Sequence, residues 1–134
     1  MRRLRSRKRL ADRGNVAIEY GLVLPVFLLF VLGIIDTGRL LWTYTTMSHA
    51  VDAAARCGAV NSTLCGTASA ITSYAVTQAY GLNVSSDAFA AAAAACGLQV
   101  NGTYPFTFII PWIGTTTPFA NNTISISVTA CYPS

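Results

Sequence analysis

Hydrophobic and polar residues divide the chain into three parts. Residues 1–14 are largely polar and basic, residues 16–35 form an almost unbroken apolar run, and the remainder alternates between short apolar and polar segments. As a helix with about 1.5 Å of rise per residue, an apolar run of about 20 residues spans about 30 Å, the thickness of the hydrocarbon core of a bilayer. The pattern therefore predicts a transmembrane helix over residues 16–35.

The helical periodicity continues beyond the apolar run. Apolar residues recur at spacings of three and four positions, which places them on one stripe of an amphipathic helix. We therefore expect one helix over residues 15–58. Its amphipathic extension, residues 36–58, is expected to pack through this stripe against other apolar side chains. The stripe consists of Leu40, Tyr44, Met47, Val51 and Ala54.

Four residues of this predicted helix bear on how it packs. Pro25 removes one backbone donor and can kink the helix, and Gly33 allows a neighbouring helix to approach closely. Asp36 and Arg39 are three residues apart, so they are placed to form an ion pair where the helix leaves the bilayer.

The residues after the helix, 59–134, predict a small extracytoplasmic domain. A turn-rich break over residues 58–66 is followed by a predicted helix over residues 67–80, which Gly81 ends. A run of alanines that follows an N-cap and ends before Gly97 indicates a second helix over residues 88–95.

From residue 98 onward the apolar period changes from helical to two. Residues 104–110 and 124–130 alternate between apolar and polar side chains, which is typical of strands buried on one face, and residues 98–100 are a candidate third strand. A polar and aromatic loop, residues 111–119, lies between the two longer strands. The predicted fold class is therefore α+β: a long N-terminal transmembrane helix that continues into a domain of two helices and a short antiparallel sheet.

The formal net charge of +4 is concentrated at one end of the chain. Seven of the nine Lys and Arg residues precede Gly14, whereas the rest of the chain has two basic and four acidic residues. A basic cluster just ahead of an apolar run keeps that end in the cytoplasm. We therefore interpret residues 1–14 as a leader peptide and expect no binding of nucleic acid.

All four cysteines follow the apolar run, on the side that this topology places outside the cytoplasm. An even number there indicates two disulfides in an oxidising compartment, although four reduced, buried thiols are an alternative. Of the three possible connectivities we favour Cys57 with Cys65, which closes a short loop, and Cys96 with Cys131, which ties down the C-terminus. By strand alternation Cys131 falls on the polar face, which fits a buried bridge poorly unless the strand has ended. No metal site is expected, because the chain has no Cys-x-x-Cys and one histidine.

A carboxylate inside the apolar run requires an explanation. Glu19 is the only charged residue between positions 16 and 35. A charge at the bilayer centre costs about 2.5–3.5 kcal/mol on insertion scales, so such a residue is by default a functional one. Gly14 precedes Glu19 by five positions and Tyr20 follows it. This arrangement resembles the prepilin-type cleavage site, and the Glu-Tyr pair resembles the Flp subgroup of type IV pilins.

This resemblance implies cleavage between Gly14 and Asn15 by a membrane-embedded prepilin peptidase. Because Gly14 has no side chain, an extended backbone can enter a confined protease site there. The amine freed on Asn15 lies one helical turn from Glu19. The Glu19 carboxylate would neutralise that amine, or the amine of a neighbouring subunit in an apolar filament core where unpaired charge is costly, with Tyr20 beside it.

Beyond the cleavage site, residues 13–59 resemble the TadE-like family, small pilin-like proteins of the tight adherence (Tad) system. The resemblance implies a minor pilin or pseudopilin that acts in assembly of, or adhesion by, a Flp-type pilus. The implied partners are the prepilin peptidase, other pilin or pseudopilin subunits, the Tad assembly platform and the bacterial inner membrane, with the N-terminus in the cytoplasm. The matching residues are Gly14, Ala17, Glu19, Leu24, Pro25, Gly33, Asp36, Gly38, Arg39, Ala50, Ala54, Ala55 and Arg56.

Three alternatives compete with this interpretation. The first is an unprocessed, signal-anchored bacterial envelope protein with a disulfide-bonded periplasmic domain, in which Glu19 is incidental. The second is a cleaved secretory signal, which is disfavoured because the apolar run is too long and is followed by a poor cleavage site. The third is an enzyme that uses His49 and Asp52, but the chain has no nucleophile elbow and no glycine-rich phosphate loop. We therefore expect no enzymatic activity and no cofactor.

Overall fold

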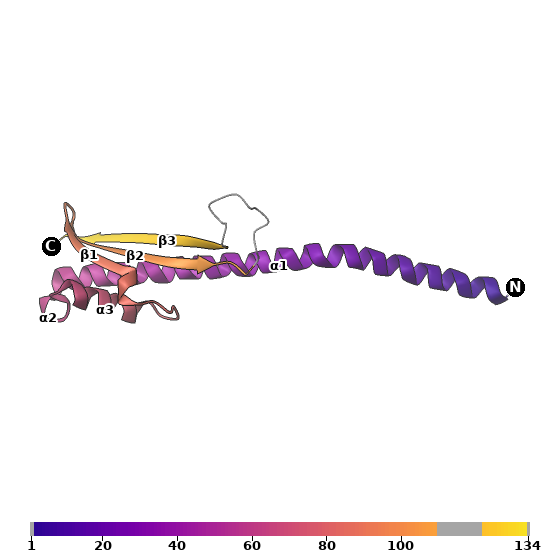
Figure 1. Ribbon diagram of the computed structural model, residues 1–134, viewed down its shortest axis with the longest axis horizontal. Helices are drawn as coiled ribbons and strands as arrows, with labels where there is room; N and C mark the ends of the chain where they lie inside the picture. The colour runs from indigo at the N-terminus through magenta and orange to yellow at the C-terminus, as the bar shows by residue number, and fades with distance from the viewer. Residues whose placement is uncertain (1, 110–121, 134) are drawn as a thin grey trace.

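The computed structural model describes the backbone of residues 2–109 and 122–133, and the side chains of these residues from Ala17 onward. The loop expected at 111–119 lies outside the described residues. One helix, α1, runs the length of the molecule, and all other elements gather around its C-terminal half (Figure 1). The elements are α1 (Arg2–Val60), α2 (Ser62–Cys65), α3 (Ala68–Gln78), the 3-10 turn η1 (Ser86–Ala88), β1 (Phe89–Ala94), β2 (Gly97–Thr107) and β3 (Thr123–Tyr132).

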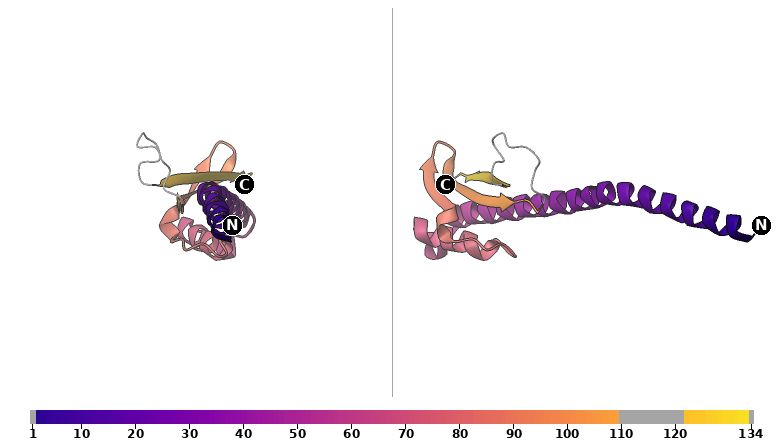
Figure 2. Two further views of the ribbon diagram at one scale, coloured as in Figure 1. Left: turned by 90° about the vertical axis from the view of Figure 1, so that its right-hand side faces the viewer. Right: turned by 45° about the vertical axis from the view of Figure 1, so that its right-hand side comes forward.

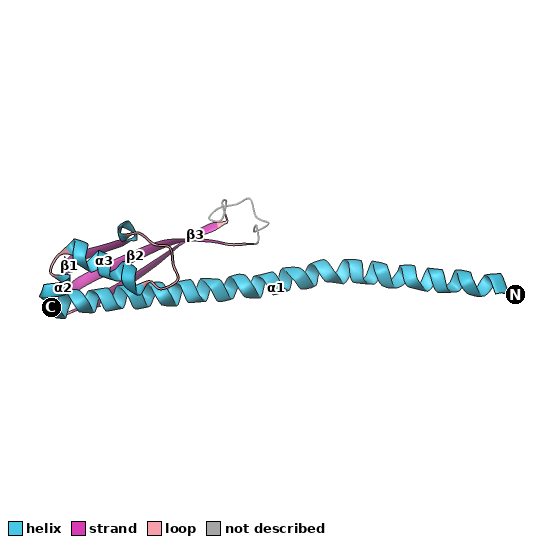
Figure 3. Ribbon diagram, turned by 90° about the horizontal axis from the view of Figure 1, so that it is seen from below, coloured by secondary structure: helices cyan, strands magenta, loops and turns pink. Residues whose placement is uncertain are grey.

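Helix α1 is longer at both ends than the predicted 15–58. It begins at Arg2 because the leader contains no Pro or Gly before Gly14 and is rich in Arg, Leu, Lys and Ala, which are good helix formers. Pro25 lies inside the helix, and α1 curves along the part that projects beyond the domain (Figures 1 and 3). We call residues 17–35 the bare half, since none of them is buried, and residues 36–60 the covered half.

The covered half lies between two layers. The three-stranded sheet lies on one side of α1 and α3 on the other, with β1 reaching round to contact α3 (Figures 1 and 2). Helix α3 confirms the prediction for residues 67–80: the Thr67 hydroxyl caps its first turn by accepting a hydrogen bond from the Ala70 amide at 3.2 Å. The turn-rich segment before it contains the short helix α2, which Asn61 caps.

The sheet has the order β1-β2-β3, and both pairings are antiparallel. The predicted alanine-rich helix over residues 88–95 is wrong, because β1 occupies residues 89–94 and pairs with β2 from Phe89↔Gly102 to Ala94↔Gly97. An isolated helix of eight residues is marginal in water, whereas this strand gains a full ladder and buries Phe89. Tertiary pairing thus overrides the helix propensity of alanine.

The candidate third strand at residues 98–100 is the beginning of β2, which continues through residue 107. Pro105 lies within β2, although Pro is normally confined to sheet edges because it has no N–H to donate. The register explains this position: β1 pairs with β2 only as far as Gly102, so at Pro105 the strand has one neighbour, β3. Strand β3 has the predicted alternation, with Ile126 and Val128 buried.

The core lies where α1, α3 and the sheet meet. Alanines on both helices let their backbones approach, and Gly102 does the same between helix and sheet: a Cβ atom there would lie 2.8 Å from Val51 Cγ2 and 3.0 Å from Met47 Cε. The buried core residues are Met47, Ala50, Val51, Ala54, Ala55, Cys65, Ile71, Ala75, Ala79, Phe89, Val100, Phe106, Ile126 and Val128.

Candidate functional site

The predicted processing and docking residues lie on the part of α1 that projects from the domain. The backbone is helical through Gly14 and Asn15, so the peptide bond between them lies inside a helix. Glu19 and Tyr20 are exposed. Within the described residues Glu19 has no hydrogen bond or ion pair. Its carboxylate is therefore placed to interact with groups outside this fold.

The bare half exposes apolar side chains on all sides. Large hydrophobic residues between positions 18 and 30 have relative exposures from 49% (Leu28) to 72% (Ile18). The most apolar 18-residue window of the helix is long enough to cross a membrane, and none of it is buried in the molecule. The core helix of a soluble protein is mostly buried, whereas this apolar segment is exposed, so it is a candidate membrane anchor.

A polar cluster marks the point where the bare half ends. Arg39 Nη1 lies 2.9 Å from Asp36 Oδ1, which is the ion pair expected from their spacing. The Asp36 side chain is 5% exposed, and it also accepts hydrogen bonds from the backbone amide of Ile109, at 3.0 Å to Oδ2 and 3.2 Å to Oδ1. We call Asp36, Arg39, Phe106, Phe108 and Ile109 the junction cluster.

The aromatic members of the junction cluster complete the contact between helix and sheet. The Arg39 guanidinium carbon lies 5.3 Å from the centroid of the Phe106 ring, a cation–π distance, and Phe106 packs edge-to-face on Phe108. Because Asp36 bonds to a backbone amide 73 residues away, the end of β2 is fixed at the level where the bare half begins. The sequence spacing indicated the ion pair but carried no local signal for Ile109.

The predicted packing stripe is correct except at one position. Leu40 is half-buried, and Met47 and Val51 are fully buried in the molecule's own core, but Tyr44 is 51% exposed. Thr43 takes the inward position, and its hydroxyl donates to the Arg39 carbonyl at 2.9 Å. A Thr is tolerated at this buried position because the local hydrogen bond satisfies its hydroxyl. Thr43 lies four positions before Met47, so helical spacing alone could have identified it as the inward-facing residue. Gly33 has open space where a Cβ would lie, so the structure assigns it no packing partner among the described residues.

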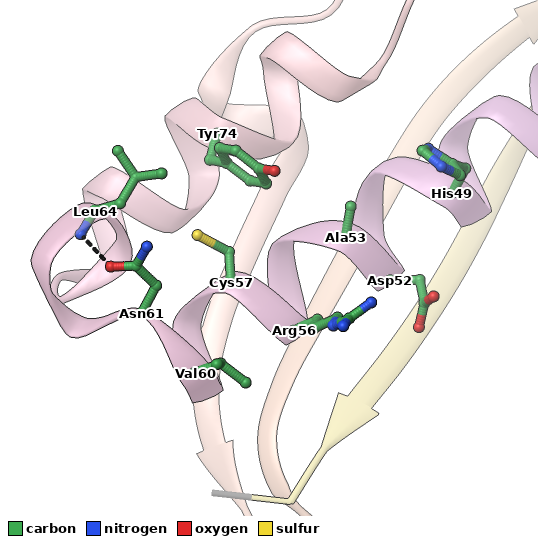
Figure 4. A pocket seen from close by; sticks show the side chains of 9 residues that line it. All are labelled: His49, Asp52, Ala53, Arg56, Cys57, Val60, Asn61, Leu64 and Tyr74. Atoms are coloured by element: carbon green, nitrogen blue, oxygen red, sulfur yellow. Dashed lines mark hydrogen bonds between the residues drawn. The ribbon is translucent and has the colours of Figure 1, made fainter.

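A shallow groove lies at the opposite end of the domain, where α1 meets α2 and α3. It measures about 420 Å³, and its walls include His49, Asp52, Arg56 and Tyr74 (Figure 4). Figure 4 shows the His49 and Asp52 side chains pointing in different directions, and within the described residues no hydrogen bond or ion pair joins them. The groove thus holds mixed polar and apolar surface without a hydrogen-bonded acid–base pair.

Both favoured disulfides are present. Cys57–Cys65 ties the end of α1 to α2, and Cys96–Cys131 ties the β1–β2 turn to the end of β3. Cys131 does lie on the polar face, as the alternation predicts, and the strand does not end before it. The bridge is compatible with this because Cys96 is exposed, so the bond lies near the surface and not in the core. Among the described residues no group of three His, Cys, Asp or Glu could hold a metal ion.

Together these features define a class of protein: a candidate single-span membrane anchor continuous with a small, disulfide-bonded α+β domain. Residues 14–56 match the family model described as TadE-like protein, which confirms the resemblance to the TadE-like family. The match covers about a third of the chain and includes Gly14, the bare half and most of the covered half. It indicates involvement in the Tad pilus system and association with its machinery and with the membrane. No curated protein and no solved structure matches the chain.

Proposed function

We propose that the protein is a minor pilin or pseudopilin of a Flp-type Tad pilus, processed between Gly14 and Asn15 by a prepilin peptidase, and that it acts without enzymatic activity in pilus assembly or adhesion. The observation that carries the proposal is the extent of the TadE-like match, which begins at Gly14 and follows α1 through the bare half and into the covered half as far as Arg56. A minor role is favoured because a folded domain of more than 70 residues follows the helix, far more than a short filament-forming pilin carries.

The proposed topology follows from charge and cysteine chemistry. The basic leader stays in the cytoplasm, the bare half crosses the inner membrane, and the domain lies in the periplasm or outside the cell. Two disulfides in the domain fit an oxidising compartment. The exposed apolar surface of the bare half is then covered by lipid before assembly and by neighbouring helices afterwards.

Glu19 is the proposed docking residue. Its carboxylate has no partner among the described residues and lies one turn from Asn15. Cleavage creates a positively charged amine on Asn15, and in a helix bundle the amine of an entering subunit approaches a neighbour's carboxylate. The pairing neutralises two charges in an apolar environment where either alone is costly.

Cleavage inside a helix requires local unwinding, and Gly14 is suited to this. Gly in a helix interior is about 1 kcal/mol less favourable than Ala, so the helix opens most easily there. We expect co-expression with an active prepilin peptidase to give a mature protein that begins at Asn15. We expect a Gly14→Ala variant to remain uncut. A Gly21→Ala variant, which changes another glycine about two turns further along the same helix, is the control and should be cut normally.

Intact mass and N-terminal sequencing of the purified protein measure this outcome, and a major pilin cut in the same cells serves as the positive control. If the protein keeps its full N-terminus while the control is cut, the alternative is supported: the protein is an unprocessed, signal-anchored envelope protein. A new terminus beyond Ile35 would contradict both, because the membrane anchor would then be removed.

A further inference from the structure

Large exposed apolar side chains gather at the end of the domain that faces the bare half. On α1, Leu41 and Trp42 are each 60% exposed and Tyr44 is 51% exposed. Two more come from distant parts of the chain: Tyr80, after α3, is 68% exposed, and Ile109, after β2, is 55% exposed. We call these five residues the collar.

The fold brings Tyr80 to α1 across a long stretch of sequence. Helix α3 runs back along α1, since Ile71 packs beside Gly58 whereas Gly81 lies beside Trp42. Gly81 has φ +76°, a left-handed conformation that ends the segment, and a Cβ there would lie 3.3 Å from Trp42 Cη2. The segment that contains Tyr80 therefore passes beside Trp42, near the N-terminal end of the covered half.

Ile109 reaches the same end from the sheet. Its amide donates to Asp36, the first residue of the covered half, so the exposed Ile109 lies where the bare half ends. Helix, α3 segment and sheet thus each contribute apolar side chains to this end of the domain.

The collar is wider than one helical stripe. Successive helical residues point about 100° apart, so Leu41 lies between Trp42 and Tyr44 around α1, and the three side chains together span about 160° of the helix surface. A single neighbouring helix covers one side only, whereas a bilayer surrounds a spanning helix completely. The geometry therefore favours lipid as the occupant.

The charges at this end agree with lipid. Between Tyr20 and Ser48 the charged residues are Asp36, which is buried, and Arg39, whose side chain is 44% exposed. An exposed guanidinium suits lipid phosphate, and Trp and Tyr are enriched at the boundary between hydrocarbon and water. Helical side chains also tilt toward the N-terminus, so the Trp42 ring extends back toward the bare half and the membrane.

We propose that the collar lies in the phospholipid headgroup layer and seats the domain directly on the membrane surface. This inference rests on the membrane insertion of the bare half in the proposed function, but not on cleavage or on pilus assembly. The domain then has a fixed contact with lipid through Tyr80 and Ile109, in addition to its covalent link through α1.

Depth-dependent fluorescence quenching tests whether the collar lies in the headgroup layer. The full chain, in a Trp112→Phe background so that Trp42 is the only tryptophan, is reconstituted in vesicles of phosphatidylcholine and phosphatidylglycerol that carry bromine at shallow or deep acyl positions. We expect Trp42 to lose fluorescence in both lipids, more in the shallow-brominated lipid. In a Trp42→Phe/Trp112→Phe background, Tyr80→Trp is expected to behave in the same way.

Two matched probes decide among the outcomes. His49→Trp, two turns further from the bare half on the same helix, is expected to show no quenching by brominated lipid, and Phe30→Trp to show strong quenching in the deep lipid. If Phe30→Trp is quenched but Trp42 and Tyr80→Trp are not, the span is inserted and the collar proposal is wrong. If Phe30→Trp is also unquenched, membrane insertion itself fails. If Trp42 becomes shielded from acrylamide only when another pilin-like chain is present, the collar is a subunit interface and the lipid proposal is overturned.

Discussion

The two halves of α1 have the same backbone conformation and opposite surroundings. The bare half has no buried residue and exposes leucines, valines and phenylalanines to its surroundings. The covered half buries small and medium side chains, such as Ala50, Ala54 and Val51, against the sheet and α3. The small residues of the covered half let a sheet and a helix approach closely, whereas the large residues of the bare half provide apolar area for a fluid or variable partner.

The covered half therefore makes contacts inside the molecule, whereas the bare half offers its surface to other molecules. The covered half supplies the helical side of the domain core, and its buried residues pack within one molecule. The bare half contributes nothing to the domain core, so its surface is available for lipid or neighbouring helices. Substitutions in the two halves should therefore have different consequences.

The largest expected effect comes from the covalent links of the domain. Removing the 35-residue bridge with Cys96→Ser/Cys131→Ser should lower the free energy of unfolding of the domain by about 4 kcal/mol in the chain-entropy model, against about 2–3 kcal/mol for the 8-residue bridge in Cys57→Ser/Cys65→Ser. Denaturant unfolding of the full chain in detergent micelles, followed by near-UV circular dichroism, measures both. Helicity of the bare half, followed in the far-UV, should persist after the domain unfolds. Loss of both signals together would show that the two halves are one cooperative unit.

Truncating one large apolar side chain in each half gives the most direct comparison. Met47 is fully buried, so Met47→Ala should destabilise the domain by about 2–5 kcal/mol through lost burial and the resulting cavity. Leu28→Ala, a similar truncation in the bare half, should change the same free energy by less than about 0.5 kcal/mol. The same micelle unfolding experiment applies. Comparable losses in the two variants would mean that the bare half contributes to the domain's stability.

The smallest effect is expected at the boundary between the halves. Asp36→Asn removes the charge that holds Arg39 and the Ile109 amide, and should cost about 1–3 kcal/mol of domain stability. Hydrogen exchange of the Ile109 amide should also accelerate. A general loss of stability would accelerate exchange across the domain, whereas loss of this bond accelerates it at Ile109 in particular. Thr37→Ala, at the adjacent exposed position, is the control and should leave Ile109 exchange unchanged. Unchanged exchange in Asp36→Asn would show that the sheet end is held by other contacts.

Sequence patterns predicted the features that depend on local periodicity or composition. The continuous helix, α3 and the alternation of β3 follow from spacings along the chain, and the two disulfides are the pairing favoured among three possible connectivities. The alanine-rich strand β1 could not be predicted this way, because its conformation comes from pairing with β2 and alanine by itself favours a helix.

The candidate site was predictable to a similar extent. The Gly14 and Glu19 spacing and the Asp36 and Arg39 pair can be seen in the sequence, because each involves residues within five positions of one another. The contact from Asp36 to Ile109 and the approach of Gly81 to Trp42 join residues dozens of positions apart. Such contacts depend on the topology of the whole domain and leave no local pattern.

The attachment of the sheet to Asp36 has a mechanical consequence. Because α1 is uninterrupted and the end of β2 is bonded to it where the bare half ends, the described residues contain no flexible joint between span and domain. The domain therefore moves with the helix as a lever arm. The 44 residues of Ala17–Val60 measure about 66 Å at about 1.5 Å per residue, so a tilt of about 10° about the Ala17 end moves the far end of the domain by about 11 Å. Under the proposed function, a small change in the contacts between the bare half and neighbouring helices would thus displace the outer end of the domain by a much larger distance.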